Sequence, residues 1–230
     1  APDWHFKVET YYQWLYDIPV KNDPEATYTM LQTGGAGDNV IMREGNLVNK
    51  GTGKNYGVEF TIEKFMSKNY YLLFNSTIYR STYTNGFNKK EWSTIFDGKF
   101  LFNLASGYEM QLKKGWTLFT DAKGSLAGGT RYTPVLEDQS RMEHKVVYDN
   151  TRVNELQVRN YFRMDLRIGY RKNRKRFTDE FFIDLQNLTD RKNLYGLIYD
   201  IDKGTYNEML LQGFMSMVTY RINFSISKNK

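Results

Sequence analysis

The sequence of 230 residues contains no cysteine, only four prolines and two histidines. The lack of cysteine excludes disulfides and suits an envelope compartment where free thiols would oxidise. No run of about 18 consecutive apolar residues occurs, which excludes a transmembrane helix. Membrane-spanning strands are not excluded, because only alternate residues of such a strand face lipid and its mean hydropathy is ordinary.

Aromatic residues are abundant, with 18 tyrosines and 15 phenylalanines. Ring side chains pack well on a pleated surface, so this composition favours strands over helices. With 40% hydrophobic residues the chain has enough material for extensive burial, and disorder is not expected. The sequence begins at Ala1 without an initiator methionine or a signal segment, which indicates a processed chain or a fragment.

Alternation of apolar and polar residues is the main structural signal. It is clearest in residues 161–170, where Phe162 and Met164 alternate with Arg163 and Asp165. Similar patterns predict eight strands in one segment that covers residues 1–230. The strands are expected near residues 4–17, 55–64, 70–83, 95–112, 116–126, 161–170, 177–188 and 213–224.

The connections between these strands alternate between long and short. The long ones lie near residues 18–54, 84–94, 127–160 and 189–212. Outer-membrane barrels sort their connections in this way, with long extracellular loops and short periplasmic turns. The sequence therefore predicts an all-β fold, an antiparallel up-and-down transmembrane β-barrel of about eight strands in a bacterial outer membrane. The first strand would run outward and the last would end in the periplasm.

Charged residues on the polar faces of the strands have two interpretations: they line a solute path through the lumen, or they pair across strands as a rigid wall. The second is favoured, for example with Arg163 or Arg167 beside Asp184. The expected lumen-facing charges are Glu59, Glu63, Lys99, Asp121, Lys123, Arg163, Asp165, Arg167 and Asp184.

Aromatic residues near strand ends are expected to form girdles at the two membrane interfaces, the alternative being ordinary strand packing. They are Trp4, Tyr12, Trp14, Tyr16, Tyr108, Trp116, Tyr170 and Tyr220. A third set, in the long loops, could capture a ligand through stacking and charge or form solvated surface. These residues are Tyr28, Trp92, Arg131, Tyr132, Arg141, Arg152 and Arg159.

Other chemistry is weakly indicated. The basic run at residues 171–176 is more typical of a solvated turn near phospholipid head groups than of a nucleic-acid site. Neither His5 nor His144 has neighbours with metal-ligand spacing, and Ser140 beside His144 is not by itself a hydrolase site. We therefore expect no catalytic activity, no metal, no cofactor and no nucleic-acid partner.

Several runs resemble one family. They are residues 53–59 (GKNYGVE), 131–134 (RYTP), 161–167 (YFRMDLR), 187–193 (NLTDRKN) and 220–224 (YRINF). In order and spacing they are similar to the C-terminal barrel of TonB-dependent outer-membrane receptors, particularly the Bacteroidetes type.

The resemblance implies a 22-stranded barrel of which this chain is an open C-terminal segment of eight strands. It also implies partners beyond this chain: the remaining strands, an N-terminal plug that TonB would contact, outer-membrane lipid, and a scarce small-molecule nutrient such as a siderophore or glycan. The alternative is a complete eight-stranded barrel with a structural, adhesive or small-pore role. Closure of that barrel would require residues 6–14 to pair with residues 218–224.

Overall fold

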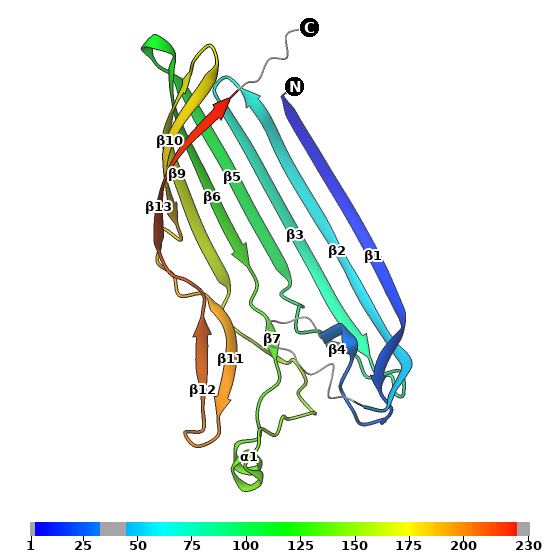
Figure 1. The fold of residues 1–230 in the computed structure, drawn as a ribbon. Coiled ribbons are helices and arrows are strands. Elements are labelled where there is room, and N and C mark those ends of the chain that lie inside the picture. Colours follow the sequence, from blue (N-terminus) through cyan, green and yellow to red (C-terminus); the bar gives the residue numbers. More distant parts are fainter. Residues whose placement is uncertain (1–2, 33–44, 225–230) are drawn as a thin grey trace.

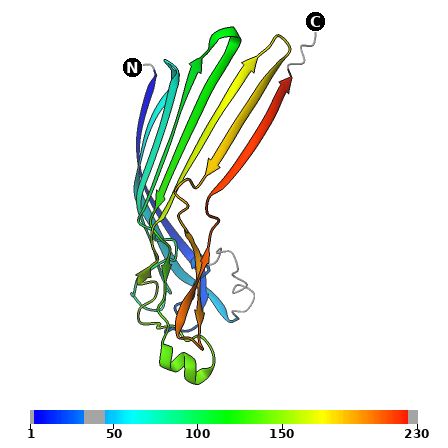
Figure 2. The same ribbon diagram turned by 90° about the vertical axis from the view of Figure 1, so that its left-hand side faces the viewer.

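The computed structural model describes residues 3–32 and 45–224. Eight long strands follow one antiparallel path in the order β1-β2-β3-β5-β6-β9-β10-β13, and β4 pairs with β3 beside it. The sheet is twisted and curved (Figure 1, Figure 2). Its strands are β1 (Trp4–Lys21), β2 (Leu47–Ser67), β3 (Tyr70–Thr84), β4 (Trp92–Ser93), β5 (Phe100–Gln111), β6 (Trp116–Ala127), β9 (Tyr161–Asn173), β10 (Phe177–Gln186) and β13 (Met215–Phe224).

The two ends of the sheet differ. At one end, which we call the short-turn end, the connections are tight, and the N- and C-terminal strands also begin and finish there (Figure 1). The β2–β3 connection is two residues, Lys68 and Asn69, both with positive φ, as a type I′ hairpin turn requires. A 3-10 turn, η3 (Lys113–Gly115), joins β5 to β6.

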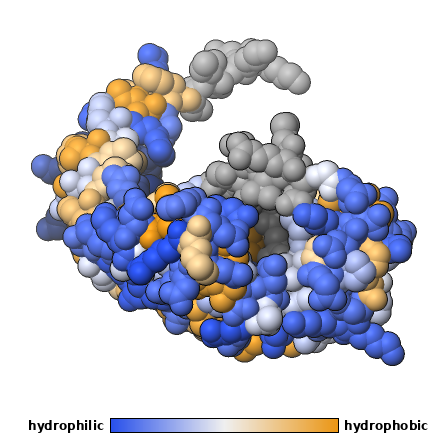
Figure 3. All heavy atoms as spheres, turned by 90° about the horizontal axis from the view of Figure 1, so that it is seen from below, coloured by the Kyte–Doolittle hydropathy of each residue, from blue (hydrophilic) through white to orange (hydrophobic). Residues whose placement is uncertain are grey.

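The opposite end, which we call the loop end, holds all the long connections, and hydrophilic side chains predominate on it (Figure 3). Among the described residues these connections contain η1 (Met30–Gln32), α1 (Glu137–Glu143), the paired strands β7 (Arg131–Tyr132) and β8 (Leu156–Gln157), and a hairpin of β11 (Leu194–Asp200) and β12 (Thr205–Leu210). The segments expected to be plain loops therefore carry structure of their own.

Several strand limits differ from the sequence prediction. The hairpin of β1 and β2 is longer than predicted. β1 continues to Lys21 and β2 already begins at Leu47, and these two residues are partners in register. A bulge between Leu15 and Ile18 breaks the alternation there. The predicted strand at residues 95–112 begins only at Phe100, because the backbone turns at residues 95–96 and Lys99 has a φ of 75°. Likewise β10 ends at Gln186, β13 begins at Met215, and β9 continues to Asn173.

Cross-strand register separates two faces. One row joins Phe6, Ile62, Phe74, Leu104 and Gly124 on what we call the apolar face. The neighbouring row on the opposite, polar face joins Glu63, Leu73, Ala105, Lys123 and Asp165. On β3, Leu72, Phe74 and Ile78 lie on the apolar face.

Large side chains on the apolar face are open to the surroundings: Phe6 is 61% exposed, Val8 66% and Ile78 64%. Exposed apolar area of this extent is unusual for a protein surrounded by water. A small buried cluster of Tyr83, Trp92 and Val153 lies elsewhere, under the connections of the loop end. No helix in the described part of the chain is long and apolar enough to cross a membrane.

The sheet is open. All register pairs of β1 join β2, and all those of β13 join β10, so within residues 3–32 and 45–224 no pairing connects the first strand to the last. Closure of eight strands, which the alternative interpretation requires, is not present in this structure.

Candidate ligand-binding site

The polar face carries a network of charged side chains in the middle of the sheet. Arg167 donates to both carboxylate oxygens of Asp184, at 2.6 and 3.1 Å. The Tyr71 hydroxyl donates to Asp121 at 2.8 Å, and both residues lie in one register row with Arg167 and Asp184. These groups border a cavity of about 430 Å³. The observed pairing matches the rigid-wall interpretation for Arg167.

Arg163 has a different partner from the expected Asp184. Its Nε donates to Asp165 on the same strand at 2.6 Å, and its Nη2 donates to Gln186 at 2.9 Å. All the predicted lumen-facing charges except Lys99 lie on the polar face of a strand. Lys99 precedes β5 and belongs to neither row, because the strand expected there is shorter.

A second ionic row near the short-turn end was not singled out from the sequence. Arg171 donates to Glu180 at 2.9 Å and to Glu109 at 3.0 Å, and Arg221 lies 3.5 Å from Glu180. Arg171 was assigned to a turn because β9 was expected to end at Tyr170. The continued alternation of residues 167, 169 and 171 was the signal that could have placed it on the polar face.

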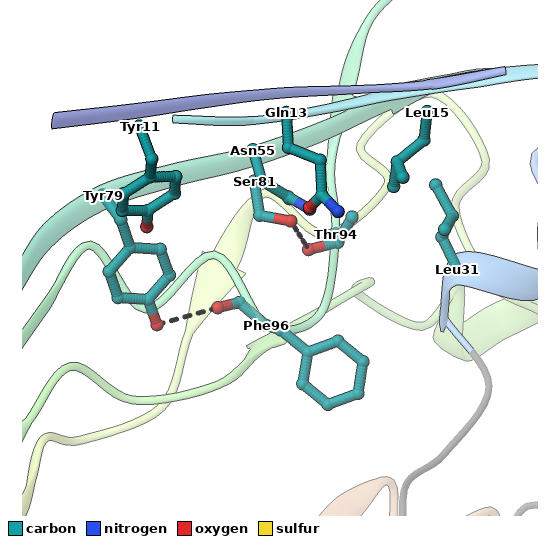
Figure 4. A pocket seen from close by; sticks show the side chains of 9 residues that line it. All are labelled: Tyr11, Gln13, Leu15, Leu31, Asn55, Tyr79, Ser81, Thr94 and Phe96. Atoms are coloured by element: carbon teal, nitrogen blue, oxygen red, sulfur yellow. Dashed lines mark hydrogen bonds between the residues drawn. The ribbon is translucent and has the colours of Figure 1, made fainter. Parts of the chain in front are cut away.

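A second cavity, also about 430 Å³, lies on the polar face toward the loop end (Figure 4). It is built by β1, β2, β3, η1 and the segment that follows β4. Its lining side chains are all uncharged: Tyr11, Gln13, Leu15, Leu31, Asn55, Tyr79, Ser81, Thr94 and Phe96. We call it the loop-end cavity.

Hydrogen bonds fix the walls of the loop-end cavity. Tyr79 donates to the Phe96 carbonyl at 3.0 Å, and Thr94 donates to the Ser81 hydroxyl at 2.8 Å (Figure 4). The Asn55 amide donates to Gln13 Oε1 at 2.9 Å. This amide pair still offers the Gln13 Nε2 donors and the Asn55 Oδ1 acceptor, so the wall can present both donors and acceptors to a ligand.

Asp97, whose side chain is fully buried, holds the connections of the loop end together. It accepts from Arg80 Nε at 3.2 Å, from Ser93 Oγ at 2.9 Å and from the Ser81 amide at 3.0 Å. Arg131 Nε lies 3.2 Å from the same carboxylate. These contacts join β3, the β3–β5 connection and the β6–β9 connection.

Two of the residues predicted to capture a ligand, Arg131 and Trp92, are largely buried under the loops. The Arg131 side chain is only 9% exposed, and it also donates to the Asn154 carbonyl at 3.2 Å, which makes it a support for the loops. Trp92 is 7% exposed and packs on Tyr83 with ring centroids 5.5 Å apart. Neither side chain presents a surface to a ligand.

The other candidates are spread over separate loops. Tyr132 packs edge-on against Tyr206, and Arg152 pairs locally with Glu155 at 2.7 Å. Tyr28 is half-buried and Arg141 is exposed on α1. Arg159 donates to Glu208 of the β11–β12 hairpin, and this hydrogen bond lowers the pKa of the Glu208 carboxyl. None of the seven candidates lines the loop-end cavity.

Most of the predicted girdle residues are exposed, among them Tyr12, Trp14, Tyr108, Tyr170 and Tyr220. In register, Tyr170 lies beside Leu118 and Phe181 on the apolar face. Among the described residues no group of three His, Asp or Glu side chains is placed to hold a metal ion.

The sequence and the structure were each compared with known proteins, and only the structure has a match. No family model matches the sequence, and no curated protein matches it. Among solved structures, the ferric yersiniabactin uptake receptor FyuA from Yersinia pestis is similar, with a TM-score of 0.60 and 16% identity. The chain has the fold of an outer-membrane receptor barrel. The similarity covers 97% of this chain and 28% of that receptor, so this chain spans little more than a quarter of the receptor's length.

Proposed function

We propose that this chain is part of the barrel wall of a TonB-dependent outer-membrane receptor, of the Bacteroidetes type, that takes up a scarce small-molecule nutrient. The observation that carries the proposal is the two-faced open sheet. Its exposed apolar face suits lipid, its opposite face is polar and carries two ionic rows, and its long connections gather at one end. Similarity to a siderophore uptake receptor supports the same role.

The open edges fit a larger barrel. Within residues 3–32 and 45–224, β1 and β13 each pair with another strand on one side only, apart from an isolated bridge between Val20 and Thr29. Free strand edges of this length favour pairing with further strands. In a 22-stranded barrel those strands would complete the wall, and the ionic rows on the polar face would meet a plug. TonB would act only through that plug.

The loop-end cavity is the proposed point of ligand contact. Its uncharged lining of tyrosine, amide and hydroxyl groups favours a neutral, polar part of a ligand, such as a hydroxyl-rich or amide-rich portion of a glycan or siderophore. Other predicted loop residues would help to capture the ligand before it reaches this cavity. They are Tyr28, Tyr132, Arg141, Arg152 and Arg159.

A growth experiment tests the uptake role. A host strain without the gene is grown on a panel of oligosaccharides as sole carbon source and of ferric siderophores as sole iron source. We expect a growth defect on at least one nutrient, which the natural gene restores and the Gln13→Leu/Asn55→Leu variant restores poorly. A matched variant, Thr10→Leu, changes a neighbouring β1 residue on the apolar face and should restore growth. Normal growth of the deletion strain on every nutrient would contradict the uptake role.

A further inference from the structure

The apolar face is hollowed at the short-turn end. The hollow has a volume of about 540 Å³ and is lined by Leu112, Trp116, Tyr170 and Phe181, with Lys113 at its rim. It belongs to β6, β9, β10 and the β5–β6 turn, away from the loop-end cavity. Tyr170 and Phe181 are 46% and 47% exposed, so the hollow has apolar walls that nothing in the described chain covers.

Cations surround this hollow. Lys172 is the register partner of Trp116, and its Nζ lies 4.8 Å from the centroid of the indole ring. The β5–β6 and β9–β10 turns lie side by side, since a Cβ added to Gly115 would be 3.9 Å from the Asn173 carbonyl oxygen. These turns add Lys113, Lys114, Lys175 and Arg176, none of which forms an ion pair with a carboxylate in the described part of the chain.

The acidic side chain on this part of the apolar face is already engaged. Asp179 accepts from Arg174 Nε at 2.7 Å and from the Tyr220 hydroxyl at 2.9 Å. Asp179 is also the register partner of Lys172. This single carboxylate therefore faces both Arg174 and Lys172, and the further cations of the two turns keep an excess of positive charge. An apolar hollow with a cationic rim is complementary to a molecule that joins an acyl chain to an anionic head group.

We propose that this hollow binds an anionic phospholipid from the membrane leaflet at the short-turn end. Lys113 and Lys172 would contact the phosphate, and the acyl chain would lie against Trp116 and Phe181. The indole ring beneath Lys172 keeps the ammonium group at the boundary between the apolar and aqueous regions. This site requires that the strands cross a membrane, but it does not depend on nutrient uptake.

Native mass spectrometry of the intact protein, purified in non-ionic detergent, tests the proposal. Phosphatidylglycerol and phosphatidylcholine with identical acyl chains are titrated in parallel. We expect phosphatidylglycerol to be retained preferentially. The Lys113→Gln/Lys172→Gln variant should bind it roughly tenfold or more weakly, because each lysine near a membrane surface contributes to anionic-lipid affinity. Phosphatidylcholine binding should be unchanged.

The control variant Lys89→Gln/Lys145→Gln removes the same charge at the loop end and should bind phosphatidylglycerol as the natural protein does. Glycerol 3-phosphate should not displace the lipid, because it lacks the acyl chain. Equal retention of both lipids, equal losses in the two variants, displacement by glycerol 3-phosphate, or a lipid-free dimer would each overturn the proposal. Growth on the imported nutrient should persist in Lys113→Gln/Lys172→Gln, which separates this test from that of the uptake role.

Discussion

Arg131 illustrates how the surroundings of a side chain determine its role. An arginine beside a tyrosine in a long loop is a reasonable candidate for ligand capture. Here the guanidinium is turned inward onto Asp97 and two loop carbonyls, so its charge is used to hold connections together. Asp97 is the centre of this arrangement because its carboxylate accepts from groups on β3 and β4 and forms an ion pair with Arg131 of the β6–β9 connection.

Replacement of Asp97 by asparagine should loosen the loop end. The change keeps the side-chain size but leaves the nearly buried Arg131 without its counter-charge, which costs about 3 kcal/mol when a buried pair is broken. Hydrogen-exchange mass spectrometry should show faster exchange at residues 81–97, which include the end of β3 and β4, while the other strands of the sheet exchange as before. Asp202→Asn, an exposed carboxylate in the β11–β12 turn, is the control and should change nothing. Unchanged exchange in Asp97→Asn would contradict the supporting role of this residue.

Within the strands, close packing on the polar face depends on glycine at particular positions. Gly169 on β9 lies between the rings of Phe119 and Phe182, and a Cβ there would lie 2.6 Å from the first ring and 2.7 Å from the Phe181 carbonyl oxygen. Gly124 on β6, by contrast, has nothing within 4 Å of an added Cβ. Two glycines on neighbouring strands therefore have opposite tolerance for a side chain.

We expect Gly169→Ala to destabilise the folded barrel by about 1–3 kcal/mol, the usual cost of overpacking. Gly124→Ala should be neutral. The measurement is the temperature at which the folded band of the detergent-solubilised protein is lost on a semi-native gel. Equal melting temperatures of the two alanine variants would contradict close packing around Gly169.

Element positions were largely predictable because their signal is local. The alternation in residues 161–170 predicted a strand, and the same residues form most of β9. Strand limits are less predictable where the alternation is interrupted. The bulge after Leu15 breaks the alternation before β1 ends, so the last residues of β1 look like a loop. The turn before Phe100 resembles a strand because Ile95 and Phe96 are apolar. The β11–β12 hairpin was not predicted for a different reason: Tyr206 packs on Tyr132 and accepts from the Val135 amide, both in a connection distant in sequence.

At the scale of the whole molecule, the alternating connection lengths predicted two unlike ends, and the structure places the long connections together at one of them (Figure 1). The loop-end cavity could not be predicted, because it brings together β1, β3 and the segment after β4 through contacts distant in sequence. The sequence likewise could not distinguish an open sheet from a closed one, which depends on pairing between the first and last strands.

We propose that the sheet spans an outer membrane with its loop end outside the cell. These 230 residues contain no cysteine, so an introduced one is the single thiol of this segment, and the protein without it serves as the labelling blank. Met142 on α1 is 73% exposed at the loop end, and Lys114 lies in the β5–β6 turn. With a membrane-impermeant maleimide on intact cells, we expect Met142→Cys to be labelled and Lys114→Cys to be labelled only after the outer membrane is permeabilised. Labelling of Lys114→Cys but not of Met142→Cys on intact cells, or equal labelling of both, would contradict the account.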